Sequence, residues 1–271
     1  MVLLTYWFMR WALAAGLVAA LACGLIGPFV RIRRLAFLAG AVAHSALGGL
    51  GAAYHYGFSP EIGALPAAIL SALLIGWLDD RAQAEGSRHE DALIGAMWAV
   101  GMAIGILFIA RTPGYNVELM SYLFGSILTV GPGRLAFMSV GLALIAIVVV
   151  LLWRPFVSLC LDPEFARLRG LPVRLLNYLL LVLVAVTVVL LIQVVGLIMV
   201  LALVTLPAAV AAHWSRDMKH MVAFATASAG LAILVGLALA VALDWPAGPV
   251  IILTCAGLFA ISTAVVRLRA L

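Results

Sequence analysis

Long apolar runs recur along almost the whole chain, and they leave little room for a water-soluble fold. Each run is near the roughly 20 residues that a helix needs to cross a bilayer. Nine runs can be drawn, at 7–28, 35–57, 62–78, 91–110, 133–152, 175–194, 196–212, 221–241 and 250–267. We therefore predict an all-α, polytopic helical membrane protein with about eight to nine transmembrane helices.

The composition supports the same conclusion. Hydrophobic residues make up 66% of the 271 residues and charged residues 10%, whereas soluble domains average about 45–50% and about 25%. A soluble enzyme and a nucleic-acid-binding domain are therefore excluded, although the net charge is +5. The runs use almost the whole chain, so we expect a single transmembrane domain over 1–271.

The distribution of positive charge predicts the orientation of the helices. Thirteen of the sixteen Lys and Arg fall in five connecting segments, at 31–34, 81–88, 154–174, 216–219 and 267–269. Nine crossings put all five on one side, and the positive-inside rule makes that side cytoplasmic, together with the C-terminus. An eight-span arrangement stays open. So does the joint at Gly196, where a tight hairpin, a broken helix and a re-entrant segment all fit.

The second run carries the main polar feature of the sequence. His44, Gly48, Gly51 and His55 follow helical spacing, so they share one face. His44 falls near the middle of the run, where an ionisable side chain usually faces a cavity or a pathway. Because neutral imidazole binds divalent transition metals, His44 is a candidate metal ligand and His55 a second one. The alternatives are a hydrogen-bonded polar contact between helices for His44 and an interfacial histidine for His55.

A second feature lies in the segment 153–174. Asp162 is a typical helix N-cap, Pro163 suits the first helical position and Gly170 suits the stop. Phe165 and Leu168 then share one face of a short amphipathic helix. Such a helix fits a groove of a partner protein, and the alternative is a helix that lies on the membrane surface.

Motifs for covalent chemistry are absent from the sequence. It contains no G-x-x-x-x-G-K-[ST] phosphate-binding loop and no H-E-x-x-H. The three cysteines form no C-x-x-C pair, which argues against a thiolate zinc site or a disulfide framework. We expect no enzyme activity in this chain, so any ATP hydrolysis would be on a partner.

Six segments of the chain resemble, in the same order, segments of a known family. This family is the zinc-uptake type of membrane permease subunit, from ABC transporters that import zinc, manganese or iron. The six segments are 33–47, 90–95, 118–128, 162–170, 206–209 and 244–249. Among them, Ala43-His44-Ser45-Ala46-Leu47 matches the second-span pattern and Asp162-Pro163-Glu164-Phe165-Ala166 matches the coupling loop. The resemblance covers nearly the whole chain.

The resemblance implies a function and a set of partners. It implies a permease in the bacterial plasma (inner) membrane that works with a dimer of cytoplasmic ABC ATPases, an extracytoplasmic metal-binding protein and a second permease copy or paralogue. The metal is the transported substrate, and no permanently bound cofactor is implied. His44 would be a ligand on the pathway. The residues that couple to the ATPase would be Asp162, Glu164, Phe165, Ala166 and Gly170.

Two positions depart from the family pattern. Gly40 stands where the family usually carries an Asp four residues before the His, and Ser126 stands where some members carry an outer-loop Asp. A lone His44 is a weaker site than a His–Asp pair. Two His44 side chains from a dimer, a different ion, and conduction without a firm site are the open alternatives.

Besides a related importer of a siderophore or cobalamin, whose permeases are generally longer than this chain, two rival functions remain at this stage. The first is an ion-coupled secondary carrier or channel that acts without an ATPase. It needs titratable groups inside the membrane, and the sequence offers His44 as the clearest of them. The second is a structural membrane subunit without a transport role.

Overall fold

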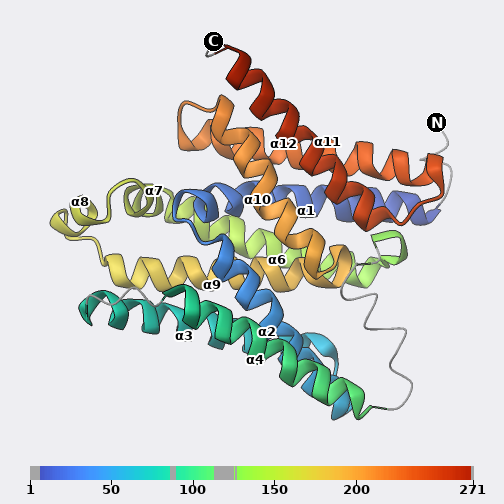
Figure 1. Cartoon of the computed structure of the whole chain (residues 1–271), viewed down its shortest axis with the longest axis horizontal. Coiled ribbons are helices and arrows are strands. Elements are labelled where there is room, and N and C mark those ends of the chain that lie inside the picture. The colour runs from blue at the N-terminus through green and yellow to red at the C-terminus, as the bar shows by residue number, and fades with distance from the viewer. Residues whose placement is uncertain (1–6, 86–89, 113–124, 126, 270–271) are drawn as a thin grey trace. The chain divides into compact units, whose positions relative to one another are not determined.

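The computed structural model describes residues 7–85, 90–112, 125 and 127–269 (Figure 1). Throughout these residues the regular structure is helical. The helices are α1 (Trp7–Ile32), α2 (Ala36–His55), α3 (Pro60–Glu85), α4 (Glu90–Ala110), the 3₁₀ turn η2 (Ile127–Thr129), α6 (Pro132–Leu151), α7 (Trp153–Leu161), α8 (Pro163–Leu168), α9 (Val173–Val195), α10 (Leu197–Trp214), α11 (Met218–Leu243) and α12 (Ala247–Arg269).

The long helices coincide with the nine apolar runs. Eight of them are long and apolar enough to cross a membrane, and the ninth run forms the shorter apolar stretch Ile94–Ala110 within α4. The predicted fold class, an all-α polytopic membrane protein, is therefore confirmed. The segment 118–124 and Ser126, which carry one of the family-like motifs, lie outside the described residues.

The chain divides into two compact units. The first unit comprises residues 1–33, 120–150 and 190–271. In it α1 packs against α10 and α11, and α12 packs against the same two helices. Small residues allow the close approach: a Cβ added at Gly27 would lie 2.6 Å from the carbonyl oxygen of Val204 on α10.

The second unit comprises residues 34–119 and 151–189. Its centre is α2, which packs extensively against both α3 and α4, whereas α3 and α4 touch each other little. Gly49 on α2 and Gly63 on α3 bring those two backbones into contact. The unit also contains α7, α8 and most of α9. That the two units form one domain over 1–271 stays a prediction.

Two features of α9 and α10 concern the joint at Gly196 and the helix around Pro207. The helices are separate and are joined by the single residue Gly196, whose φ of 82° and ψ of 157° suit glycine. Thr205-Leu206-Pro207 predicted a break or bend inside the next helix. The predicted break is wrong, because α10 continues through Pro207 to Trp214.

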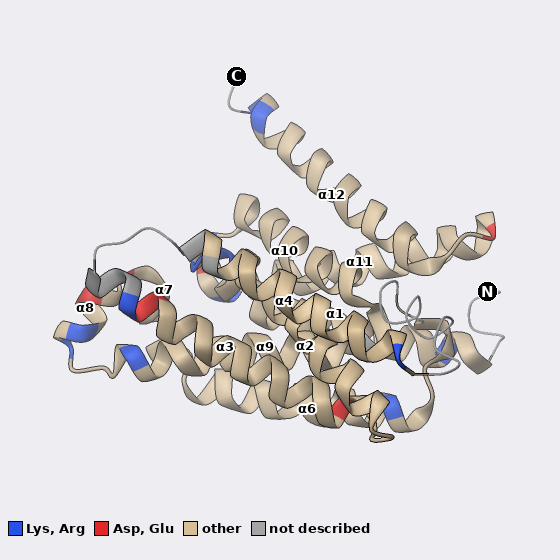
Figure 2. Cartoon of the chain, turned by 60° about the horizontal axis from the view of Figure 1, so that its bottom comes forward, with Lys and Arg blue, Asp and Glu red and all other residues tan. Residues whose placement is uncertain are grey.

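Charged residues lie at the ends of the helices and in the segments between them (Figure 2). The lengths of the helices carry almost no charge, as expected for segments that face lipid or one another. The cysteines Cys23, Cys160 and Cys255 are buried, and none of the three forms a disulfide bond. This agrees with a packing role for all three.

Candidate functional site

The polar face of α2 lies against α4. A Cβ added at Gly48 would be 2.9 Å from the carbonyl oxygen of Gly101, and one at Gly51 would be 2.7 Å from that of Gly105. The two helices therefore touch through their backbones for two turns, as small residues at fixed spacing allow. The face that the sequence suggested as a pathway lining is closed by α4 in this conformation.

His44 lies at one end of this contact and is buried. Its side chain is 8% exposed, and its ring stacks on the indole of Trp98 with the centroids 4.4 Å apart and the planes 24° apart. The Nδ1 atom is shielded from solvent and has no hydrogen-bond partner. The structure thus does not supply the hydrogen bond that the alternative interpretation, a polar contact between helices, would need at this atom.

Gly40 makes the position of Trp98 possible. A Cβ at position 40 would lie 2.6 Å from the nearest carbon of the indole ring, which is closer than real Cβ contacts. The indole therefore fills the space one helical turn before His44. A side chain at position 40 and the present position of Trp98 exclude each other.

His55 lies at the opposite end of the same contact and is exposed. Its Nδ1 atom is 3.2 Å from Oγ1 of Thr112, and that hydroxyl donates its single hydrogen to the carbonyl of Phe108 at 2.9 Å. With its hydrogen on that carbonyl, the hydroxyl can accept from the Nδ1–H tautomer of His55, which carries its lone pair on Nε2. Metal-binding histidines commonly use this arrangement, in which one nitrogen donates and the other binds.

The structure does not bring the two histidines together. Eleven residues of α2 separate them, which is roughly 16 Å along a helix. Among the described residues there is also no cluster of three or more His, Cys, Asp or Glu that could hold a metal ion. Within the described part of the chain the two histidines therefore belong to no shared cluster of metal ligands in this conformation.

The short helix that the sequence predicted over 162–170 is present as α8, and its capping is confirmed. The Asp162 side chain accepts a hydrogen bond from the backbone N–H of Phe165 at 2.9 Å, and Pro163 begins the helix. Gly170 follows the helix with a φ of +78°. Glycine adopts that left-handed conformation at a lower energetic cost than any other residue.

The two sides of α8 differ in exposure. Ala166 is fully buried, whereas Phe165 is 48% and Leu168 86% exposed. The guanidinium of Arg169 lies 4.6 Å from the centroid of the Phe165 ring. Within the described residues α8 therefore presents an uncovered apolar surface edged by positive charge.

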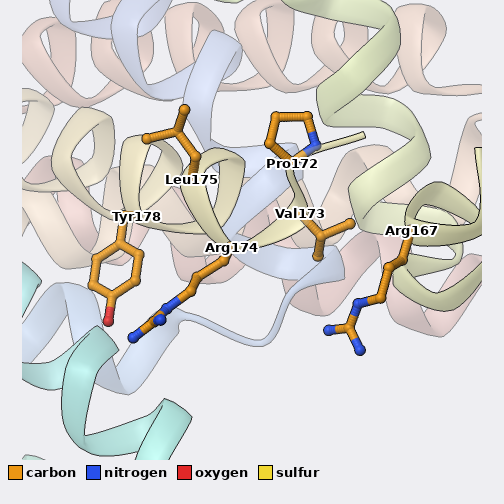
Figure 3. A pocket seen from close by; sticks show the side chains of 6 residues that line it. All are labelled: Arg167, Pro172, Val173, Arg174, Leu175 and Tyr178. Atoms are coloured by element: carbon orange, nitrogen blue, oxygen red, sulfur yellow. The ribbon is translucent and has the colours of Figure 1, made fainter. Parts of the chain in front are cut away.

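A pocket of about 490 Å³ lies beside α8 (Figure 3). Figure 3 shows Arg174 and Tyr178 pointing the same way from α9, with Arg167 on the α8 side. The Arg174 guanidinium donates to Asp80 of α3 at 2.7 Å, and the Tyr178 hydroxyl donates to the same carboxylate oxygen at 3.0 Å. The pocket lining is completed by Pro172, Val173 and Leu175.

Sequence reasoning missed Trp98 and the Asp80–Arg174 pair. The signal for Trp98 is its position one turn before Gly101-x-x-x-Gly105, a pattern that permits close helix packing but is frequent in membrane helices. The signal for the ion pair was an acidic residue at the end of one apolar run and a basic residue at the start of another. Neither signal shows which residue Trp98 or the charged side chain contacts, because contacts between residues so far apart in the sequence depend on the packing of the helices.

Comparison with known proteins identifies the family. Residues 5–266 match the profile described as the ABC 3 transport family. An uncharacterized membrane protein of Synechocystis sp. is 44% identical over 262 residues, which cover 96% of this chain and 92% of the relative. The manganese transport system membrane protein MntC of Halalkalibacterium halodurans is 31% identical over 261 residues, covering 96% and 88%.

A solved structure agrees with the fold. PsaBC from Streptococcus pneumoniae, in complex with a Fab, superposes with a TM-score of 0.86 at 27% sequence identity and covers 96% of this chain and 92% of that chain. The match thus extends over α8 and over the helices that contain His44 and Trp98. This chain is a multi-pass membrane protein that belongs to the ABC 3 transport family.

Proposed function

We propose that the chain is the membrane-spanning permease subunit of an ATP-driven ABC importer for a divalent transition metal: zinc, manganese or iron. The family match over residues 5–266 and the likeness to a manganese transport system membrane protein support this function. In this proposal a cytoplasmic ABC ATPase dimer hydrolyses ATP and an extracytoplasmic protein delivers the metal. A second permease copy or paralogue completes the translocation unit. The chain itself does no covalent chemistry.

We assign the Arg-rich connections and the C-terminus to the cytoplasmic side of the bacterial plasma membrane. The segments 154–174 and 267–269 then lie on the side where positive charge accumulates. On this assignment α8 faces the ATPases, and His55 faces the side from which the metal arrives.

The observation that carries the proposal is the geometry of α8 in a chain of this family. An uncovered Phe165 and Leu168 on a capped helix need a partner groove or a membrane surface, because exposed apolar side chains are costly in water. The rim of Arg167 and Arg169 favours an acidic groove on a protein. Asp162, Glu164, Phe165, Ala166 and Gly170 are the residues that we assign to coupling.

For the ion we propose passage by alternating access, with His44 as the ligand inside the membrane and His55 as the first ligand at the outer end. Neutral imidazole suits zinc and iron, and it holds a divalent ion without adding charge to the membrane interior. Because α4 closes the α2 face at Gly48 and Gly51, the ion can reach His44 from this face only in a conformation in which α2 and α4 separate.

The coupling assignment can be tested with the chain, its ATPase and its binding protein in liposomes. Phe165→Ala should lower the stimulation of ATP hydrolysis by the metal-loaded binding protein. Phe137→Ala on α6 is the matched control, since Phe137 is similarly exposed at 43% but lies on a different helix. Equal stimulation in both variants would contradict the coupling role of α8.

A separate experiment tests the rival carrier. Liposomes that contain this chain alone are given a pH gradient and external metal, and accumulation of the metal is measured. We expect none above empty liposomes. Accumulation by the chain alone would overturn the proposed dependence on an ATPase.

A further inference from the structure

Trp98 is a large side chain at the contact between α2 and the glycines of α4. At Gly48 and Gly51 the contact is made with the backbone of Gly101 and Gly105. One turn earlier the indole of Trp98 takes the place of these backbone contacts, and it covers two successive turns of α2. It lies on Gly40, where a Cβ would be 2.6 Å from its ring, and it stacks on His44.

The stacking fixes the imidazole without using its nitrogens. The ring planes are only 24° apart, so contact with the indole is made through the face of the imidazole, and the nitrogen lone pairs lie in the plane of the ring. The shielded Nδ1 atom has no hydrogen-bond partner. A buried polar atom without a partner costs free energy and calls for an explanation. A nitrogen that binds a cation in another conformation is such an explanation.

We propose that Trp98 is a positioning residue for His44. In the described conformation its indole holds the imidazole in one orientation and shields it, and a divalent cation reaches the ring nitrogens only after the indole has left the stack. This inference rests on the proposed function, because it assumes that His44 meets the transported ion.

The pairing of Gly40 with Trp98 separates this role from simple packing. The indole can lie flat on α2 because Gly40 has no side chain. For the same reason His44 has a neutral aromatic neighbour one turn away and no second metal ligand at position 40. Trp98 itself is half-buried, so its indole is not fully enclosed by the packed helices. The pocket lined by Ser45, Met97 and Gly101 adjoins this part of α4 and measures about 540 Å³.

The experiment measures how fast His44 reacts with diethyl pyrocarbonate, which modifies accessible imidazoles. The purified full chain is labelled in detergent, and each histidine is quantified by peptide mass spectrometry, with exposed His55 as the internal standard. In the unaltered chain His44 should react much more slowly than His55. Trp98→Ala should raise the rate at His44 by about tenfold or more, because removing the indole removes the local opening step. Trp98→Phe keeps a stacked ring, so diethyl pyrocarbonate should still modify His44 slowly in this variant.

Two controls separate this result from a loosened structure. Val100→Ala changes a 56% exposed residue on the same helix and should leave the rate at His44 unchanged. A Ser45→Cys reporter, placed where Ser45 is 7% exposed against Gly101, should stay unreactive toward a water-soluble thiol reagent in the Trp98→Ala chain. If this cysteine becomes reactive together with His44, the two helices have separated and the positioning role is overturned. An unchanged rate at His44 in Trp98→Ala also overturns it.

The labelling needs no ATPase and no transported metal, so it can fail independently of the proposed function. If Trp98→Ala exposes His44 while metal uptake is indifferent to His44→Ala, the positioning by Trp98 stands and the pathway role of His44 fails. If metal uptake depends on His44 but the labelling rate of His44 is the same with and without the Trp98 indole, the pathway role of His44 stands and the positioning role of Trp98 fails.

Discussion

The Nε atom of Arg174 lies 2.7 Å from Oδ2 of Asp80, so an ion pair joins the first turn of α9 to the α3 helix. The side chains are 69% and 29% exposed, and a pair this open to solvent contributes at most about 1 kcal/mol. Its consequence is therefore geometric. It joins the start of α9 to α3 directly after the segment that leads out of α8.

Removing this ion pair should affect coupling more than stability. We expect Asp80→Ala to change the free energy of unfolding by less than about 1 kcal/mol and to reduce the ATPase stimulation that depends on α8. Tyr178→Phe keeps the ion pair and loses one hydrogen bond, so its effect on stimulation should be smaller. Thermal unfolding in detergent and ATPase assays in liposomes measure the two quantities. A large loss of stability with intact stimulation would contradict this account.

The contact between α2 and α4 predicts opposite outcomes for two glycines of one helix. A Cβ at Gly101 would lie 2.6 Å from the Cα atom of Ser45, whereas a Cβ at Gly95 would meet nothing within 4 Å. Gly101→Ala should therefore cost about 1–3 kcal/mol through overpacking against a backbone. Gly95→Ala should be neutral or stabilising by up to about 1 kcal/mol, since alanine favours helix. Equal melting temperatures for the two variants would disprove the close approach.

The cap of α8 makes a local prediction. Asp162→Ala removes the acceptor for the N–H of Phe165 and should weaken α8 by about 1 kcal/mol. Asp162→Asn keeps a side-chain oxygen and should behave like the unaltered chain. Hydrogen exchange at the Phe165 amide reports the difference directly. Unchanged protection in the Ala variant would mean that α8 is held without its cap.

The N-terminus of α11 predicts a dependence on pH. The pKa of Asp217 is lowered, first because the backbone N–H of His220 donates to its carboxylate and then because the His220 side chain does so. Because this pKa is lower in the folded state, the ionised carboxylate stabilises the fold at pH values above the pKa of the unfolded state. This stabilisation is lost as the pH falls through the pKa of the folded state.

Asp217→Asn is the variant that tests this dependence, because it keeps a capping oxygen but does not titrate in this range. The stability difference between the unaltered chain and Asp217→Asn should be constant near neutral pH and shrink below about pH 4. Thermal unfolding of both chains across this range measures it. A difference that grows as the pH falls would contradict the assignment.

The fold was largely predictable from the sequence, because hydrophobic periodicity and the length of a bilayer span are local properties. The nine runs and the capped helix after Asp162 were found in this way. The break predicted at Pro207 was wrong: the missing N–H of a proline removes one hydrogen bond, and α10 tolerates this loss because it packs against α11 and α12. Propensity was overridden there by contacts between helices.

The candidate site was predictable in its residues but not in its environment. Burial of an ionisable side chain singled out His44, yet the sequence could not show that its face is covered by α4 or that Trp98 fills the space over Gly40. The hydrogen bond from His55 to Thr112 was hidden for the same reason, since the two residues are 57 positions apart. Such contacts depend on which helices are neighbours and in what register, and no local pattern encodes that.

The most direct test of the proposed function is ATP-dependent metal uptake by liposomes that contain this chain, its ATPase and its binding protein, each tested with zinc, manganese and iron. We predict uptake of at least one ion, and an initial rate reduced by about tenfold or more in His44→Ala, since even outer-shell changes at a metal site cost about 10–100-fold. His213→Gln, in the other unit, should retain uptake. Uptake that is equally fast with and without the His44 imidazole would contradict the pathway that we assign to it.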